Sequence, residues 1–227
     1  MESTMKILYG TANQAKLSFM ARSLEQCRDG MQEKLELIGL EQIVQETKIL
    51  PPEIEEVGHT PLHNARIKAK AYYDIYGIPV FSCDTGLFLK KEETGELLPE
   101  EEQPGLHVRV MNGRRLTDEE LQQRIIRLVR KYGLLEAQYR NAVCFILDHN
   151  HVYESDAEEL SGKSFLFTDQ PHSIMVPGFP LDSLSIQKRT GKYYYDLAEH
   201  EADELVTDQE KNGFIHFFRQ AGILSAN

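Results

Sequence analysis

A short segment near the N-terminus carries side chains that suit a phosphate group. An apolar run ends at Gly10, and Thr11, Asn13 and Lys16 follow it at the start of a helical pattern. The backbone N–H groups of such a turn, a hydroxyl, an amide and an ammonium can all point toward one anion. The same residues are compatible with an ordinary strand–helix turn in which Thr11 or Asn13 caps the helix and Lys16 is solvated. Because the segment matches neither of the common glycine-rich phosphate loops, other segments must decide.

A second candidate is the sequence Asp84-Thr85-Gly86, which follows an apolar stretch over residues 78–83. We expect that stretch to be a strand with Asp84 at its C-terminal end, where open α/β sheets bind their ligands. A carboxylate there can accept a proton from water or hold a metal ion. Thr85 can donate its N–H or its hydroxyl to a phosphate oxygen. The alternative is a turn that simply ends the strand, because Asp and Gly are common turn residues.

The composition narrows the class of protein. The 227 residues are 41% hydrophobic and 27% charged, and no apolar run reaches the length of a membrane span. The N-terminus lacks the pattern of a secretory signal, so we expect a cytoplasmic protein that does not bind membranes. The net charge of −11 disfavours nucleic acid as a partner. The cysteines, Cys27, Cys83 and Cys144, lack metal-type spacing and are expected to be reduced thiols in or near the core.

The elements that must position these side chains alternate between strands and amphipathic helices, which is typical of an α/β fold. We expect strands over residues 5–10, 35–40, 78–83, 142–147 and 164–167, with another near Val152. We expect helices after the turn at Gly10, from Thr60-Pro61 to Gly77, from the capping box at Thr117, and from a second capping box at Thr207. The segment from the second strand to Pro51-Pro52 and the acidic segment 92–103 are expected to be loops.

Several motifs follow one another along the chain in a fixed order. They are Gly10-Thr11-Ala12-Asn13-Gln14-Ala15-Lys16, the segment from Glu56-Val57-Gly58 through Thr60 and Asn64-Ala65 to Lys68-Ala69, Ser82-Cys83-Asp84-Thr85-Gly86-Leu87 with Pro104-Gly105, Gly178-Phe179-Pro180-Leu181-Asp182, and Gln209-Glu210-Lys211-Asn212 with His216. In this order they resemble the motifs of the inosine triphosphate pyrophosphatase family, which hydrolyses deaminated and other non-standard purine nucleoside triphosphates. Each motif is weak alone, but together they extend over residues 7–221.

The resemblance implies a fold and an activity. The fold is an elongated, two-lobed α/β domain over residues 1–227, with a central mixed sheet flanked by helices and an active-site cleft between the lobes. The protein would be a homodimer that hydrolyses a nucleoside triphosphate, such as ITP, XTP or dITP, to the monophosphate and pyrophosphate. Water attacks the α-phosphorus in this reaction, a divalent metal, Mg²⁺ in the family, assists it, and Asp84 occupies the position of the proton acceptor.

The resemblance also implies roles for individual side chains. Lys16 and Lys211 would be the catalytic cations, because a triphosphate needs positive charge and oriented donors as its own charge develops. The phosphate contacts would be Thr11, Asn13, Lys16, Thr85 and Lys211. The nucleoside contacts would be Phe179, Asp182 and His216, although a core position suits Phe179 equally well.

Departures from the family motifs raise a competing hypothesis. His63 stands where the family has a glutamate that helps to hold Mg²⁺, and Cys83 replaces the first residue of an aspartate pair. With His63 and Asp84 as ligands, the metal site would favour Mn²⁺ or another softer ion, unless His63 is only a surface residue of a first helical turn. Phe217 replaces an arginine that would bind the purine oxygen, so the base preference is expected to be broader or different. The competing hypothesis is a catalytically weak relative that only binds a nucleotide or another phosphorylated ligand.

Overall fold

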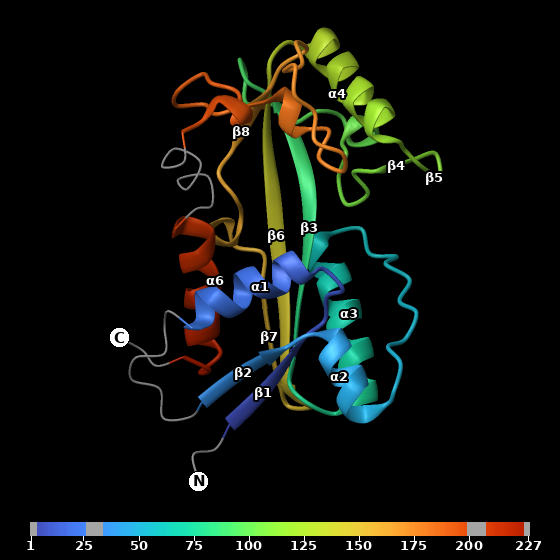
Figure 1. Ribbon diagram of the computed structural model, residues 1–227, viewed down its shortest axis with the longest axis vertical. Helices are drawn as coiled ribbons and strands as arrows, with labels where there is room; N and C mark the ends of the chain where they lie inside the picture. The colour runs from blue at the N-terminus through green and yellow to red at the C-terminus, as the bar shows by residue number, and fades with distance from the viewer. Residues whose placement is uncertain (1–3, 26–33, 199–207, 225–227) are drawn as a thin grey trace. The chain divides into compact units, whose positions relative to one another are not determined.

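A computed structural model describes residues 4–25, 34–198 and 208–224 (Figure 1). The α-helices are α1 (Gln14–Glu25), α2 (Leu40–Thr47), α3 (Pro61–Tyr76), α4 (Asp118–Tyr132) and α6 (Asp208–Gln220). The strands are β1 (Thr4–Tyr9), β2 (Lys34–Ile38), β3 (Val80–Lys91), β4 (Val110–Met111), β5 (Arg114–Arg115), β6 (Leu135–Asp148), β7 (His151–Ser155), β8 (Phe165–Phe167) and β9 (Ser185–Ile186). The short 3-10 helices are η1 (Glu100–Glu102), η2 (Glu158–Leu160), η3 (Asp182–Leu184) and η4 (Tyr194–Asp196).

The strands form a seven-stranded mixed sheet in the order β2-β1-β3-β6-β8-β9, in which β7 also pairs with β6. β1 pairs in parallel with β2 and β3, whereas the β6–β7, β6–β8 and β8–β9 pairs are antiparallel. β4 and β5 form a separate hairpin. The prediction of an α/β fold with a central mixed sheet flanked by helices is confirmed. By its contacts the chain divides into two compact units: unit 1 (Met1–Thr85, Asn141–Leu160 and Glu210–Asn227) and unit 2 (Gly86–Arg140 and Ser161–Gln209).

Unit 1 has two apolar clusters, because successive side chains of a strand point to opposite faces. Ile7 and Tyr9 of β1 join one cluster with Met20 of α1 and Phe218 of α6. Leu8 joins the other cluster, which α2 and α3 cover. These two helices lie beside each other in Figure 1. The sheet of unit 1 therefore has α1 and α6 on one face and α2 and α3 on the other.

The helices that carry site residues begin where their sequences predict. In α3 the Thr60 hydroxyl accepts a hydrogen bond from the His63 N–H, and Gly77, with a φ of +63°, ends the helix. In α4 the side chains of Thr117 and Glu120 each bond the other's backbone N–H, which is the predicted capping box. Unit 2 buries the apolar stripe of α4 against β3, β6 and β8.

The predicted end of the third strand is wrong. β3 does not stop before Asp84 but continues to Lys91, so Asp84 and Thr85 lie in the middle of a strand rather than in a turn. Leu87 and Leu89, which come next on one face, are fully buried in unit 2. Because burial of these leucines favours the extended chain, Gly86 does not end the strand.

Other predictions are corrected or fall outside the described residues. The predicted loop after β2 contains α2, which buries only Ile43 and therefore has a weak apolar signal. The strand predicted over 142–147 extends at both ends to become β6. Cys83 and Cys144 are buried thiols that form no disulfide with another described residue, as predicted, whereas Cys27 and Thr207 lie outside the described residues. Among the helices described, none is long and apolar enough to cross a membrane.

Candidate active site

The turn over residues 10–16 joins β1 to α1 and is organised by its own side chains. Thr11 Oγ1 accepts a hydrogen bond from the Asn13 N–H at 3.1 Å, and Asn13 Oδ1 accepts one from the Lys16 N–H at 3.1 Å. Asn13 therefore caps α1, as the capping interpretation predicts, whereas Lys16 is not simply solvated but donates a hydrogen bond to Thr85. A cap does not exclude an anion, because the Thr11 hydroxyl keeps its proton to donate and the first N–H groups of a helix favour negative charge.

Gly10 fixes this turn against the rest of unit 1. Its N–H donates to the Phe81 carbonyl at 2.8 Å. A Cβ at position 10 would lie 2.5 Å from the Tyr72 ring and 2.6 Å from Ser82 Oγ, so only glycine fits. Ala12, where the family motif has glycine, has no positive φ, so the alanine causes no backbone strain.

Asp84 faces α3 and holds a lysine. Lys68 Nζ lies 2.6 Å from Asp84 Oδ1 and 3.6 Å from Glu56 Oε2. Asn64 Nδ2 donates to Asp84 Oδ2 at 3.2 Å. The Lys68 and Asp84 side chains are only 12% and 13% exposed, so this ion pair is shielded from water. Both carboxylate oxygens are hydrogen-bonded, which fixes the orientation of Asp84.

Asn64 connects Asp84 to the segment that precedes α3. It is fully buried, and its Oδ1 accepts a hydrogen bond from the Gly58 N–H at 2.8 Å. A Cβ at position 58 would lie 2.4 Å from that oxygen, so Gly58 is required for this contact. Sequence reasoning did not single out Asn64 and Lys68 as site residues. Their spacing of four residues, which places them on one face of a helix, was the available signal.

Thr85 points to the opposite face of β3 and holds a second lysine. Lys16 Nζ donates to Thr85 Oγ1 at 3.1 Å, and Thr85 Oγ1 donates to Asn141 Oδ1 at 2.7 Å. Asn141 Nδ2 in turn donates to the Leu160 carbonyl at 2.8 Å. The hydroxyl proton of Thr85 is therefore used within the protein. Of the two phosphate donors predicted for Thr85, the backbone N–H is the one that this arrangement leaves for a ligand.

The edge of β3 beside this position extends past the end of β1. The last paired residues of the two strands are Tyr9 and Phe81, and Gly10 then bonds the Phe81 carbonyl. In a strand the N–H groups of alternate residues face the same edge, so the Thr85 N–H faces the edge where β1 has ended. This N–H and the Lys16 ammonium are both donors for an anion bound at that edge.

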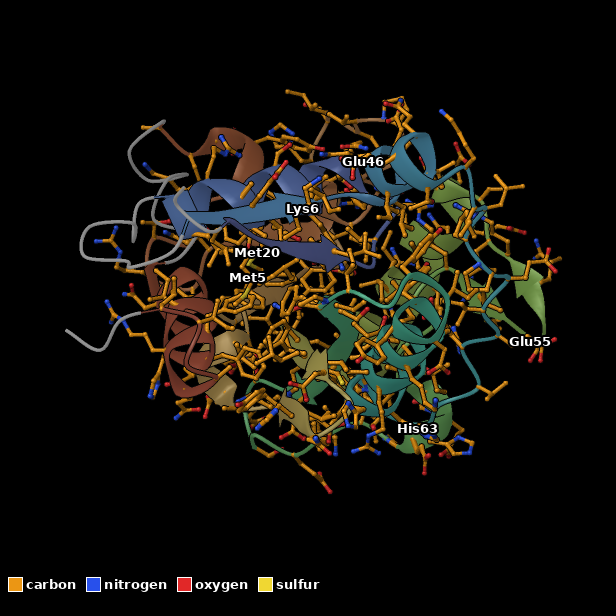
Figure 2. All side chains as sticks on the ribbon, turned by 90° about the horizontal axis from the view of Figure 1, so that it is seen from below. Met5, Lys6, Met20, Glu46, Glu55 and His63 are labelled. Carbon is orange, nitrogen blue, oxygen red and sulfur yellow. The ribbon has the colours of Figure 1, made fainter. Side chains whose placement is uncertain are left out.

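The remaining predicted residues of unit 1 are more dispersed. His63 is exposed in the first turn of α3, and Figure 2 shows it at the surface. His216 Nδ1 lies 2.8 Å from Glu159 Oε1, and its Nε2 lies 3.1 Å from Gln220 Nε2, so its contacts are to η2 and to its own helix. Lys211 belongs to α6, but its side chain lies outside the described residues. Within residues 4–25, 34–198 and 208–224, no group of three or more His, Cys, Asp and Glu could hold a metal ion.

Two residues that depart from the family motifs share one apolar cluster. Cys83 and Phe217 are 7% and 4% exposed and both pack in the cluster that α1 and α6 cover. The Phe217 ring lies 6.4 Å from the Phe81 ring and 5.6 Å from the Phe218 ring. An unpaired aspartate or arginine would be costly in these surroundings, so the two substitutions suit the same apolar packing.

Phe179 and Asp182 line a cavity in unit 2. Its volume is about 440 Å³, and its walls come from residues 106–110, Leu121, Tyr139 and residues 178–182. Phe179 is 61% exposed, so the alternative of a core position is wrong. Burial raises the pKa of the Asp182 carboxyl.

The loop that carries Phe179 is attached to the start of α4. Asp118 Oδ2 accepts a hydrogen bond from the Gly178 N–H at 2.6 Å, and Arg109 donates both to the Gly178 carbonyl and to Asp118 Oδ1 at 2.6 Å. Gly178 has a φ of +88°, which glycine adopts readily. By contrast, the Asp182 carboxylate has no hydrogen-bond or ion-pair partner in the part of unit 2 that the structure describes. It can therefore accept hydrogen bonds from a ligand.

Comparisons with known proteins identify the family of this chain. The Ham1 family model matches residues 7–164. The dITP/XTP pyrophosphatase of Hydrogenobaculum sp. (strain Y04AAS1) is 30% identical over 155 residues, which cover 65% of this chain and 70% of that protein. The dITP/XTP pyrophosphatase of Aquifex aeolicus (strain VF5) is 36% identical over 86 residues, 38% of this chain and 36% of that protein.

Solved structures show the same fold. A HAM1 protein from Coxiella burnetii superposes with a TM-score of 0.66 at 17% identity, covering 96% of this chain and 98% of its own. The Ham1 protein of Staphylococcus aureus gives a TM-score of 0.64 at 18% identity, covering 96% and 99%. Because the family match spans more than half of the sequence, the chain belongs to the Ham1 family, the inosine triphosphate pyrophosphatase family that its motifs resemble.

Proposed function

We propose that the protein hydrolyses a nucleoside triphosphate to the monophosphate and pyrophosphate. The observation that carries this proposal is the pair of adjacent residues in β3, Asp84 and Thr85, which hold Lys68 and Lys16 on the two faces of one strand. A triphosphate carries about four negative charges near neutral pH, and ammonium groups with oriented N–H donors stabilise them. The names of the two dITP/XTP pyrophosphatases support the same substrate class.

In the proposed reaction Lys16 and Lys68 have different roles. Lys16 and the Thr85 N–H bind the phosphates and stabilise the charge on the pyrophosphate leaving group. Asp84 orients a water molecule and accepts its proton as the water oxygen attacks the α-phosphorus and the bond to the bridging oxygen breaks. Lys68 keeps the Asp84 carboxylate in place. The further phosphate contacts that we propose are Thr11, Asn13 and Lys211.

Unit 1 offers some of the oxygen ligands that a divalent metal needs. Glu56 and Asp84 both place a carboxylate near the Lys68 ammonium, and Mg²⁺ prefers such oxygen ligands and keeps several water or phosphate oxygens. A bound divalent metal neutralises phosphate charge and lowers the pKa of water. We propose His63 as a further ligand that shifts the preference from Mg²⁺ toward Mn²⁺ or a softer ion. Turnover with Mg²⁺ equal to or better than that with Mn²⁺ or Co²⁺ would contradict this role of His63.

We propose that the unit 2 cavity takes the nucleoside. Phe179 would pack against the base and Asp182 would accept a hydrogen bond from a base N–H. His216, which belongs to unit 1, is proposed as a nucleoside contact from the family resemblance alone. Hypoxanthine and xanthine carry an N–H at position 1 of the ring, whereas adenine has an acceptor there. Since Phe217 is buried where the family has an arginine, we expect selection against other bases to be weaker than in the family.

One observation favours binding without hydrolysis as a second candidate. Cys83 stands where the family motif has an aspartate, and its surroundings are apolar. Metal binding would then rest on fewer acidic groups, and a nucleotide could bind without being cleaved.

A panel of triphosphates separates the two candidates. Pyrophosphate release is measured with ITP, XTP, dITP and the standard nucleotides, each with Mg²⁺, Mn²⁺ or Co²⁺, and nucleotide binding is measured by calorimetry. We expect pyrophosphate release, with the deaminated purines turned over fastest. Tight binding without release of pyrophosphate with any metal supports the second candidate and overturns the first.

We also propose a homodimer, as the family resemblance implies, and a cytoplasmic location, as the sequence pattern of the N-terminus predicts. Light scattering of the purified protein at micromolar concentration tests the assembly. A mass of one chain, 26.1 kDa, would contradict the dimer.

A further inference from the structure

We propose that Asn141 is a positioning residue that fixes the Lys16 ammonium for the triphosphate, acting through the hydroxyl of Thr85. The inference rests on the proposed function, which gives Lys16 its ligand. Asn141 comes from β6, outside every motif that the sequence offered, and its amide bonds the Thr85 hydroxyl that holds Lys16.

The hydrogen bonds that link Leu160, Asn141, Thr85 and Lys16 allow only one assignment of donors and acceptors. The Leu160 carbonyl can only accept, so Asn141 must turn its Nδ2 toward it and its Oδ1 toward Thr85. Because that oxygen can only accept, the Thr85 hydroxyl must donate its proton to it. The lone pairs of Thr85 Oγ1 then remain for the Lys16 ammonium, which can only donate. The orientation of the Asn141 amide therefore determines that Thr85 is an acceptor for Lys16.

Asn141 is itself held by buried structure. Its side chain is only 7% exposed. The Leu160 carbonyl belongs to η2, and α6 packs directly on η2, because a Cβ at Gly213 would lie 2.1 Å from the Glu159 carbonyl oxygen. The contact between His216 and Glu159 joins the same two elements. Asn141 is thus held in place by η2, on which α6 packs, and through Thr85 it restrains the ammonium group of Lys16 at the start of α1.

Fixing a lysine matters because a free side chain of this length loses much rotamer entropy when it binds a ligand. Part of that entropy is already lost when Thr85 holds the Lys16 ammonium before a triphosphate arrives. Loss of Asn141 should therefore weaken ground-state binding of the phosphates more than it slows the chemical step.

The test uses isosteric variants of the full-length protein. Asn141→Leu removes the amide, and Thr85→Val removes the hydroxyl while keeping its shape. The matched control is Gln138→Leu, which removes an amide of the same strand that donates to the Gly162 carbonyl at 3.1 Å. Thermal unfolding of each variant reports whether the fold is kept.

We expect Asn141→Leu and Thr85→Val each to raise KM about 10-fold with kcat changed less than about 3-fold, as a lost hydrogen bond to a charged group predicts. The double variant should show the same rise as Thr85→Val alone, because both act through one hydroxyl. Gln138→Leu should leave both constants unchanged. A KM of Asn141→Leu close to that of the wild type, or effects that multiply in the double variant, would overturn the proposal.

A second measurement does not depend on hydrolysis. Lysines are acetylated with an N-hydroxysuccinimide ester, and the rate at Lys16 is measured by mass spectrometry relative to the exposed Lys70. Releasing Lys16 from Thr85 should raise its relative rate about 3-fold or more in Asn141→Leu and Thr85→Val but not in Gln138→Leu. If no triphosphate is hydrolysed but these rates rise, the proposed function fails and the positioning role stands. Unchanged rates in both variants would refute the positioning role.

Discussion

The candidate phosphate site of unit 1 and the candidate nucleoside cavity of unit 2 differ in how their polar side chains are held. In unit 1, Asp84 and Thr85 have hydrogen-bond partners on all of their side-chain oxygens, and the two lysines are held with them. In unit 2, Asp182 faces the cavity without a partner among the residues described there, and Phe179 is exposed. The first region is complete before a ligand binds, whereas the second would obtain its partners from the ligand.

The difference follows the chemistry of the proposed substrate. Every nucleoside triphosphate presents the same chain of phosphates, so one fixed set of donors serves all of them. The base differs between nucleotides, and the groups proposed to contact it are the exposed Phe179 ring and the Asp182 carboxylate. The comparison therefore predicts that changes in unit 1 affect the binding and cleavage of the phosphates whichever base is present, whereas changes at the cavity affect the choice and affinity of the nucleoside.

The largest effect should come from Asp84→Asn, which keeps the size of the side chain but cannot accept a proton from water. We expect kcat to fall by about 1,000-fold, within the range for loss of a general base. The matched control is Asp74→Asn, which removes an exposed ion pair with Lys70 on α3 and should change kcat less than about 2-fold. Full activity of Asp84→Asn would remove Asp84 from the role of base and would end the contrast between the two regions.

The second-largest effect should be on the stability of unit 2 and should come from Glu136, which does not line the cavity. Burial tends to raise the pKa of Glu136, but hydrogen bonds from Lys188, Ser164 and Lys90 outweigh it and lower the pKa to about 2. The ion pairs therefore stabilise the fold above the ordinary pKa of 4.5, and this contribution is lost as the pH falls from 4.5 toward 2. Glu136→Gln should lower the free energy of unfolding by about 2 kcal/mol at pH 7.

Urea unfolding at several pH values checks this prediction. The deficit of Glu136→Gln relative to the wild type should shrink below pH 4.5, while KM and kcat at neutral pH stay unchanged. An equal deficit at acidic and neutral pH would show that the charge of Glu136 does not stabilise the fold.

A smaller effect is expected from Phe179→Ala at the cavity. We expect KM to rise about 10-fold with kcat nearly unchanged, because the ring would pack on the base in both the bound and the transition state. Since Phe179 is 61% exposed, the free energy of unfolding should hardly change. Ile174→Ala, which shortens another exposed side chain of the same loop that does not line the cavity, is the control. A large fall in kcat for Phe179→Ala would place part of the chemistry in unit 2.

The smallest effect is expected from Asp182→Asn. Burial raises the pKa of Asp182, so the folded protein holds this proton at a higher pH than the unfolded chain does. The stability of the wild type should therefore fall as the pH rises through the window above 3.8, and the loss persists at pH 7. Asp182→Asn should raise the free energy of unfolding slightly at pH 7 and leave it unchanged well below 3.8. Reduced stability of the variant at pH 7 would show that the carboxylate has a stabilising partner.

Much of this arrangement could be predicted from local sequence signals. The caps at Thr60 and Thr117 and the glycine at position 77 place α3 and α4 correctly, because capping depends on nearby residues. The turn after β1 and the strand before Asp84 were also predicted. The length of β3 was not, because Gly86 resembles the end of a strand unless the buried leucines that follow it are weighed.

Partners that come from distant segments could not be predicted. Lys68 and Asn64 contact Asp84 only because one face of α3 packs against β3. Asn141 bonds Thr85, from which it is separated by 56 residues of sequence. It precedes an apolar run that looks like any ordinary strand, so nothing in the local sequence marks it as a site residue. The register between strands selects these partners, and no local pattern records it.

The alternation of Asp84 and Thr85 across β3 also limits how this segment can evolve. An insertion or deletion of one residue just before them would turn each side chain to the other face, so the carboxylate would meet Lys16 and the hydroxyl would meet Lys68. Substitution is tolerated more easily, because a changed side chain leaves the register intact. The segment can therefore change its residues, as Cys83 shows, but it cannot change its length.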